Sequence, residues 1–416
     1  MKYYIIAGEA SGDLHGSNLM KGIYAEDPQA EIRFWGGDCM HEVWNRFQNR
    51  ATPLAAGGGT QPEGMGGVVL KPVPDFVQSG LVRHYKDGAV MGFVEVLAKA
   101  RKLLGNVSFC KKDILAWKPD VVILIDYPGF NFKIAEFAHK AGFKVFYYIA
   151  PKVWASRERR IKKLKAYVDR LFIVFPFEKP YFDSKGISYI YEGNPLVDAV
   201  DDSKAMKETR EEFAERNGLK DSPFIAMLAG SRKGEISTMM PVLTEFAARM
   251  HSLPQYAEYH FLIAGAPARN IKDYEPWLTE ENRGYIDVLF GETQSIIRHS
   301  EAAVVNSGTA SLETVLFNTP QVVGYITHPI TYWIGRKIVK IKYISLGNLI
   351  IGRLGFKEFI QDECNPEALV REIRELVENE ARRTQMLSDY ADIRNALGNS
   401  GASSAVAKAM IEELRK

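Results

Sequence analysis

The chain has 416 residues, of which 46% are hydrophobic and 25% are charged, and its formal net charge is +2. This length exceeds what a single hydrophobic core usually supports, so we expect about two domains. The nearly neutral charge argues against a dedicated nucleic-acid binder, which carries a broad basic excess.

The cysteine spacing and the lengths of the apolar runs indicate in which cellular compartment the protein is expected. Cys39, Cys110 and Cys364 lie far apart in the sequence, without a disulfide framework or zinc spacing, as expected in a reducing cytoplasm. The first residues lack the order of a signal peptide, and no run approaches the ~18–20 apolar residues of a membrane span. We therefore expect a cytoplasmic protein, in which any membrane contact is peripheral.

The first half of the chain alternates short apolar runs with helical periodicity, which predicts a mostly parallel sheet covered by helices. The expected strands are 3–7, 32–35, 121–125, 144–149, 170–174 and 188–191. The expected helices are 13–25, 93–117, 133–141 and 158–167. Residues 51–92 are glycine-rich and aperiodic, and we expect a long irregular loop there.

The same rhythm repeats after residue 193. Strands are expected at 224–228, 259–264, 302–305 and 321–323, and helices at 204–217, 235–251 and 311–316. The sequence thus predicts an α/β protein of two Rossmann-like doubly wound domains facing across a cleft, 1–197 and 198–384. The acidic segment 198–203 is the expected linker, and the helices from about 385 to 416 are expected to pack back on the first domain. Ligands bind such folds at the C-terminal ends of the strands.

Several cofactor motifs are missing. The chain has no G-x-G-x-x-G, no G-x-x-x-x-G-K-[ST] and no Asp-x-Asp, and its His and Cys residues do not cluster. These absences argue against a dinucleotide enzyme, a P-loop ATPase and a metal-dependent enzyme, so we expect no cofactor and no metal.

Two motifs in the first half end apolar strands. In the first, residues 8–13, Ser11 and Gly12 open a helix whose N–H groups suit a phosphate, and Glu9 is a carboxylate at a strand end. The alternative is an ordinary turn capped by Ser11 or Asp13. In the second, Asp126 follows a buried strand and suits a general base, although a capping or turn aspartate is the alternative.

Two motifs in the second half have the same form. Gly230 and Ser231 suit a phosphate-binding turn, and Arg232 suits a diphosphate through its planar fork of donors. The alternative is a surface arginine at a helix start, where the helix dipole disfavours it.

The other motif offers hydroxyls and N–H groups to phosphate at Ser307, Gly308 and Thr309, and Glu313 suits ribose hydroxyls. A capping box of Thr309 and Glu313 is the alternative, although their spacing is four rather than three.

Two segments suit an anionic membrane surface. Residues 93–107 carry an apolar helical stripe beside basic residues, typical of an interfacial helix or of a core-facing one. Residues 330–357 carry six Lys/Arg and no Asp/Glu, which suits anionic lipid or a solvated face beside a nucleotide.

Taken in order, these segments resemble the lipid-A-disaccharide synthase family, glycosyltransferase family 19. The matching strings are GEASGD (8–13), MGFVEVL (91–97), KPDVVILIDYPGFN (118–131), PKVWA (151–155), FPFEK (175–179), GNPLVDA (193–199), AGSR (229–232), SGTASLE (307–313) and VGYITHP…YISLGNLI (323–350). The resemblance implies a GT-B fold and inverting transfer from UDP-2,3-diacylglucosamine to 2,3-diacylglucosamine 1-phosphate, with a β-1′,6 bond and release of UDP.

By the same resemblance, Asp126 is the candidate base, Glu9 lies near the reacting sugar and Arg232 faces the diphosphate. Glu313 is expected at the ribose and Asn348 on the nucleotide side. The expected contacts to membrane or acyl chains are Met91, Phe93, Val94 and Leu97. The sequence departs from the family where Gly129 replaces an Asp and Ala229 replaces a Pro.

Other functions stay open at this point. A UDP-GlcNAc 2-epimerase-like isomerase shares the expected architecture, and so does a transferase for another lipid-linked sugar. A membrane-bound UDP-sugar-binding protein without catalysis is the non-enzymatic alternative, and Gly129 is its one hint. A homodimer is a further possibility.

Overall fold

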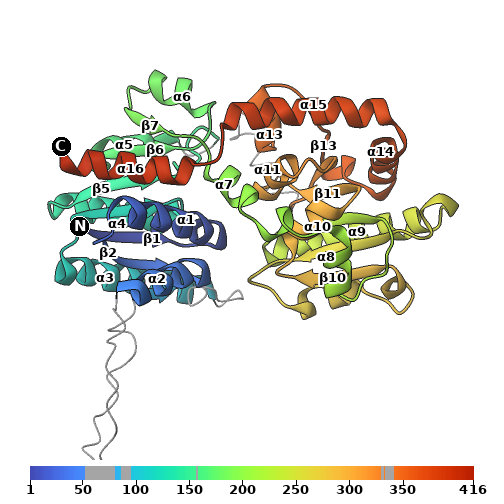
Figure 1. Ribbon diagram of the computed structural model, residues 1–416, viewed down its shortest axis with the longest axis horizontal. Coiled ribbons are helices and arrows are strands. Elements are labelled where there is room, and N and C mark those ends of the chain that lie inside the picture. Colours follow the sequence, from blue (N-terminus) through green and yellow to red (C-terminus); the bar gives the residue numbers. More distant parts are fainter. Residues whose placement is uncertain (52–79, 86–94, 156–157, 329–331, 333–341) are drawn as a thin grey trace, which may run out of the picture.

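A computed structural model describes residues 1–51, 80–85, 95–155, 158–328, 332 and 342–416, without the side chains of 49–51 and 95–103. It contains two parallel sheets that lie side by side, each covered by helices (Figure 1). The predicted fold class is therefore confirmed.

The first sheet has the strand order β3-β2-β1-β4-β5-β6-β7. Its strands are β1 Lys2–Ala7, β2 Glu31–Gly36, β3 Leu81–His84, β4 Val121–Ile125, β5 Lys144–Tyr148, β6 Arg170–Ile173 and β7 Tyr189–Tyr191. Its helices are α1 Ala10–Glu26, α2 Asp38–Ala51, α3 Glu95–Trp117, α4 Pro128–Lys140, α5 Ile161–Tyr167, α6 Glu178–Ser184 and α7 Pro195–Asp201.

The second sheet has the order β10-β9-β8-β11-β12-β13. Its strands are β8 Phe224–Leu228, β9 His260–Gly265, β10 Ile286–Phe290, β11 Ala302–Asn306, β12 Gln321–Tyr325 and β13 Glu358–Ile360. Its helices are α8 Arg210–Arg216, α9 Lys233–His251, α10 Thr293–His299, α11 Thr309–Leu316, α13 Leu346–Ile351, α14 Pro366–Glu378 and α15 Glu380–Leu397.

The central strands are buried on both faces, as covered parallel sheets require. Along β1, Tyr3 and Ile5 point into a core shared with the second domain, and Tyr4 and Ile6 point into a separate core under α3 and α4. This alternation explains why the strand reads as a continuous apolar run rather than an amphipathic one.

The chain crosses between the domains twice at one place. The segment expected as a linker is largely helix α7, and its Asp198 is buried. The Asp198 carboxylate accepts hydrogen bonds from the N–H groups of Gly401 (2.5 Å) and Ser403 (2.7 Å). The first of the two C-terminal helices, α15, packs on the second domain, and the last, α16 (Ala402–Arg415), lies against α1 of the first (Figure 1).

Candidate active site

The predicted motifs meet in pairs at the strand ends. Strands β1 and β4 are neighbours, and the strand order reverses between them, so Glu9 and Asp126 flank the switch point of the first sheet. Strands β8 and β11 are the equivalent neighbours of the second sheet, which brings the turns 229–232 and 306–309 together. Doubly wound sheets bind ligands at such points.

The turn after β4 has an unusual backbone. Asp126 and Tyr127 both have positive φ, +42° and +44°, and Ile149 at the end of the adjacent β5 has φ +60°. Such conformations cost ~1–3 kcal/mol per residue and concentrate at functional sites. Two hydrogen bonds to the Asp126 carbonyl hold the turn, one from Tyr147 Oη at 2.6 Å and one from Asn131 Nδ2 at 2.8 Å.

The Asp126 carboxyl is largely enclosed. Burial raises its pKa above the ordinary value, Lys152 opposes this by favouring the anion, and the Glu9 charge adds to the rise. A general base gains strength as its pKa approaches the working pH. Sequence reasoning missed Lys152, although it stands in PKVWA directly after β5, at the same edge of the sheet as Asp126.

Glu178 fixes the loop that carries Lys152. Its buried carboxylate accepts hydrogen bonds from Trp154 Nε1 (3.1 Å) and from the N–H groups of Val174 (3.2 Å) and Phe175 (3.1 Å). Burial raises the pKa of Glu178 to about 7 against these three donors. The sequence showed Glu178 only as part of the string FPFEK.

The alternative of a turn capped by Ser11 or Asp13 is not observed, because the N-cap residue of α1 is Glu9. The Glu9 side chain makes no capping hydrogen bond and is 55% exposed. Asp13 instead accepts from the N–H groups of Gly37 (2.6 Å), Cys39 (3.0 Å) and Met40 (3.1 Å), so it organises the turn into α2. Ser11 is exposed at the start of α1, and the neighbouring Gly12 packs on β1.

The turn after β8 centres on a carboxylate. Glu235 Oε2 accepts from the N–H groups of Ser231 (3.0 Å) and Arg232 (3.1 Å), and Glu235 Oε1 accepts from Arg232 Nη1 (3.1 Å). Gly230 has φ +106°, and a Cβ there would overlap Asn306 and Glu235. This turn therefore presents converging N–H donors to an anion, and Glu235 supplies that anion in this structure.

The turn after β11 lies beside it. Gly308 is the N-cap of α11 and makes no side-chain cap, so the alternative capping box of Thr309 and Glu313 is absent. Ser307 Oγ donates to the Ile344 carbonyl at 3.2 Å. Glu313 accepts from Gln294 Nε2 at 3.2 Å, and burial raises its pKa.

Asn348 has a different environment from the one expected. It is fully buried, and its Nδ2 donates to the Phe356 carbonyl (3.0 Å) and to Glu358 Oε1 (2.8 Å). Its Oδ1 accepts from the N–H groups of Gly355 (2.8 Å) and Phe356 (3.4 Å). Every polar group of Asn348 thus stabilises the turn between α13 and β13, and none is free for a nucleotide in this structure.

The expected membrane contacts Met91, Phe93 and Val94 lie outside the described residues, as does the side chain of Leu97 in α3. Residues 330, 331 and 333–341 of the basic segment 330–357 are also outside. Among the described residues, α3 exposes three large apolar side chains, Leu104 (58%), Phe109 (48%) and Leu115 (49%). No helix in the described part of the chain is long and apolar enough to cross a bilayer.

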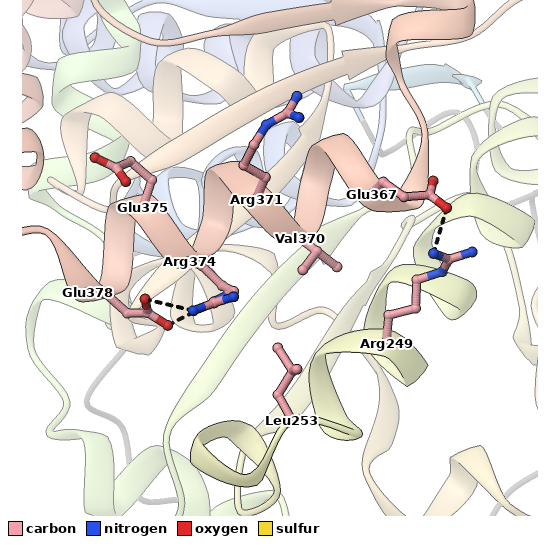
Figure 2. Close-up of a pocket in the computed structure, with 8 residues that line it drawn as sticks. All are labelled: Arg249, Leu253, Glu367, Val370, Arg371, Arg374, Glu375 and Glu378. Carbon is pink, nitrogen blue, oxygen red and sulfur yellow. Dashed lines mark hydrogen bonds and ion pairs between the residues drawn. The ribbon is translucent and has the colours of Figure 1, made fainter.

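An open groove of about 490 Å³ lies elsewhere, between the end of α9 and α14 (Figure 2). Its charged side chains pair with one another, Arg249 with Glu367 (2.5 Å) and Arg374 with Glu378 (2.9 Å). Because it contains none of the predicted residues and its charges are internally balanced, we do not assign the active site to it.

The two domains meet through their site turns. Arg232 Nη2 of the second domain lies 3.9 Å from Glu9 Oε2 of the first. Two doubly wound domains whose switch points carry facing polar turns are the arrangement of the GT-B fold class. A putative UDP-N-acetylglucosamine 2-epimerase from Listeria monocytogenes has a similar fold, with a TM-score of 0.64, 14% identity and coverage of 99% of this chain and 97% of that one. A spinosyn rhamnosyltransferase has a TM-score of 0.55 at 12% identity, covering 99% and 100%.

The sequence comparisons define the family within this class. Residues 79–411 match the family model described as lipid-A-disaccharide synthetase. The lipid-A-disaccharide synthase of Syntrophus aciditrophicus is 34% identical over 416 residues, which cover 99% of this chain and 97% of that protein. The chain belongs to the lipid-A-disaccharide synthase family, as its motifs predicted, and the likeness to epimerases is one of fold alone.

Proposed function

We propose that the chain transfers 2,3-diacylglucosamine from its UDP carrier to the 6-hydroxyl of 2,3-diacylglucosamine 1-phosphate. The bond between the donor C1 and the diphosphate breaks, the acceptor O6 bonds to C1 in the β configuration, and UDP leaves. One observation carries the proposal beyond family membership: an enclosed carboxylate, Asp126, stands on one domain and an exposed cation, Arg232, on the other. Single displacement with inversion needs a base and a leaving-group stabiliser on opposite sides of the reacting carbon.

Asp126 accepts the proton of the attacking hydroxyl, a contribution typically worth ~10²–10⁴ in rate. Its enclosure makes it a stronger base than a solvated aspartate, and the nearby Lys152 charge favours its ionised form. Glu9, which is exposed beside it, contacts the reacting sugar.

The second domain binds UDP. Arg232 neutralises the charge that develops on the departing diphosphate, as preorganised cations do in phosphate-releasing enzymes. The N–H groups and hydroxyls around Gly230, Ser231, Ser307, Gly308 and Thr309 surround the phosphates, and Glu313 accepts from the ribose. The phosphates of UDP replace the Glu235 carboxylate as the acceptor of the hydrogen bonds from the Ser231 and Arg232 N–H groups.

Both substrates carry acyl chains, so the site must reach a bilayer surface. We propose peripheral binding to an anionic membrane through α3, whose exposed Leu104, Phe109 and Leu115 lie near Lys111 and Lys112. A homodimer stays a prediction that light scattering tests.

The test is product identity. The chain is incubated with both lipids in mixed micelles, with and without a chelator, and the products are analysed by mass spectrometry. A β-1′,6-linked tetraacyl disaccharide 1-phosphate formed equally in both supports the proposal. Epimerisation of plain UDP-GlcNAc without any disaccharide from the lipids would replace it with the isomerase function.

A further inference from the structure

A second cavity, of about 40 Å³, lies in the first domain at the ends of β1 and β3. This volume holds roughly three water molecules, which is close to the size of one phosphate group. Arg83 lies on one side of it and Tyr127 on the other, and Trp35 and Phe130 lie between them.

The cavity shares a wall with the proposed catalytic turn. Tyr127 follows Asp126 directly, and its ring covers Gly8, the residue before Glu9, so closely that a Cβ at Gly8 would overlap it. Tyr127 stacks on Phe130 with ring centroids 5.7 Å apart, and Phe130 contacts Trp35 at 5.4 Å. A continuous aromatic wall therefore joins the base to the far side of the cavity.

Arg83 supplies a cation at that far side. The β2–β3 register pairs it with Trp35, and its guanidinium lies 6.0 Å from the Trp35 ring and 5.9 Å from the Phe109 ring. Arg83 Nη1 donates to Asn106 Oδ1 at 2.6 Å. The hydrogen bond to Asn106 therefore orients the Arg83 guanidinium, and no carboxylate of the described residues forms an ion pair with it.

We propose that this cavity binds the phosphomonoester of the acceptor sugar, with Arg83 as its cation and Asn106 as the residue that positions Arg83. The inference rests on the proposed function. A guanidinium presents paired donors that match phosphate oxygens, and aromatic surroundings strengthen the attraction by limiting screening. In the acceptor, the 1-phosphate and the attacking 6-hydroxyl flank one sugar ring. Because only the aromatic rings of the cavity wall separate Arg83 from Asp126, one acceptor sugar can place its phosphate at Arg83 and its 6-hydroxyl at Asp126. A sugar without the phosphate loses the contact to Arg83.

The test compares two acceptors, 2,3-diacylglucosamine 1-phosphate and its 1-O-methyl analogue, in the wild-type chain and in Arg83→Gln. For the wild type, removal of the phosphate lowers kcat/KM for the acceptor about 10- to 100-fold, the usual worth of a charged hydrogen-bonded contact. Arg83→Gln loses the same factor with the phosphorylated acceptor and shows no further loss with the methyl analogue. Its KM for the donor stays unchanged.

Lys162→Gln, an exposed charge on α5, is the matched control and keeps the full preference for phosphate. If Arg83→Gln does not fold, Arg83→Lys replaces it in the test. Lysine keeps the positive charge but lacks the paired donors of the guanidinium, so the preference for the phosphorylated acceptor should decrease but remain measurable. An undiminished preference in both Arg83 variants overturns the inference. Absence of transfer by the wild type with either acceptor would instead count against the proposed function.

Discussion

Glu9 and Arg232 are 223 positions apart in sequence and belong to different domains, yet their charged groups lie 3.9 Å apart. Both side chains are largely exposed, at 55% and 71%, so the contact itself adds little stability. The contact shows that the strand ends of the two sheets face one another closely enough for one substrate to contact both domains.

Replacement of Arg232 is expected to weaken UDP binding. Arg232→Gln removes the cation from the turn that also contains Gly230 and Ser231, and we expect the Kd for UDP to rise about 10- to 100-fold. Isothermal titration calorimetry measures the change. The control is Lys233→Gln, which removes an equal, exposed charge from the next position. Equal weakening in both variants would mean that general attraction, rather than this contact, binds the diphosphate.

Asp126 is expected to control the rate more than binding. Asp126→Asn keeps the size of the side chain but removes its basicity, and kcat should fall ~10²–10⁴-fold with little change in the donor KM. Because burial raises the pKa of Asp126 and the base must be ionised, wild-type kcat rises with pH through a midpoint above that of an ordinary aspartate. An unchanged kcat in Asp126→Asn would assign the proton to another group.

Alanine substitutions at Gly230 and Gly234, which lie close together in the sequence, distinguish the effect of a left-handed backbone conformation from the effect of helix propensity. Gly230→Ala imposes φ +106° on a residue with a Cβ and overlaps Asn306, so we expect a loss of more than about 1 kcal/mol in unfolding free energy and weaker UDP binding. Gly234→Ala lies in the first turn of α9 with no atom within 4 Å of the new Cβ, and should gain ~0.4–1 kcal/mol. Denaturant unfolding of both variants compares them directly, and similar losses would contradict the explanation.

His15 links stability to pH. It is buried in α1 with its Nδ1 unpartnered, and burial lowers its pKa to about 4 from 6.5, although Asp198 opposes the shift. The unfolded chain therefore binds more protons between these values, and stability falls as the pH drops from 6.5 towards 4, by up to about 3 kcal/mol. Glu178, with its pKa raised to about 7, works oppositely, because stability falls as the pH rises from 4.5 to 7.

The His15 contribution is isolated by difference. Acidification from pH 7 to pH 4.5 should lower the unfolding free energy less in His15→Gln than in the wild type, and more in Glu178→Gln, because the two groups contribute with opposite sign. Identical pH profiles in wild type and His15→Gln would show that His15 does not titrate as proposed.

The sequence pattern predicted the central strands well and the edges poorly. Buried strands such as β4 and β8 are uninterrupted apolar runs, and both match their expected bounds. At the sheet edges, β10 contains Asp287, β13 has three residues and β3 lies within the glycine-rich region expected to be irregular. Edge strands are short and half exposed, so their periodicity is weak.

The site shows a similar division. The motifs that follow central strands predicted that Glu9, Asp126 and Arg232 lie at the candidate site. The strand order alone places these turns at the switch points of the two sheets, independently of how the longer loops pack. Lys152 and Glu178 were missed because their roles depend on how two loops pack. Asn348 resembled a ligand contact in sequence, but its partners are in the next turn of the chain, and no pattern distinguishes a buried structural amide from an exposed binding one.

The most direct test of the account is UDP release by the purified chain, measured with the donor alone and with the donor plus 2,3-diacylglucosamine 1-phosphate, in the wild type and in Asp126→Ala. Displacement by the acceptor hydroxyl, with Asp126 as its base, predicts release only when both lipids are present and a loss of ~10²-fold or more in the variant. Equal UDP release without the acceptor, or full activity of Asp126→Ala, would contradict it.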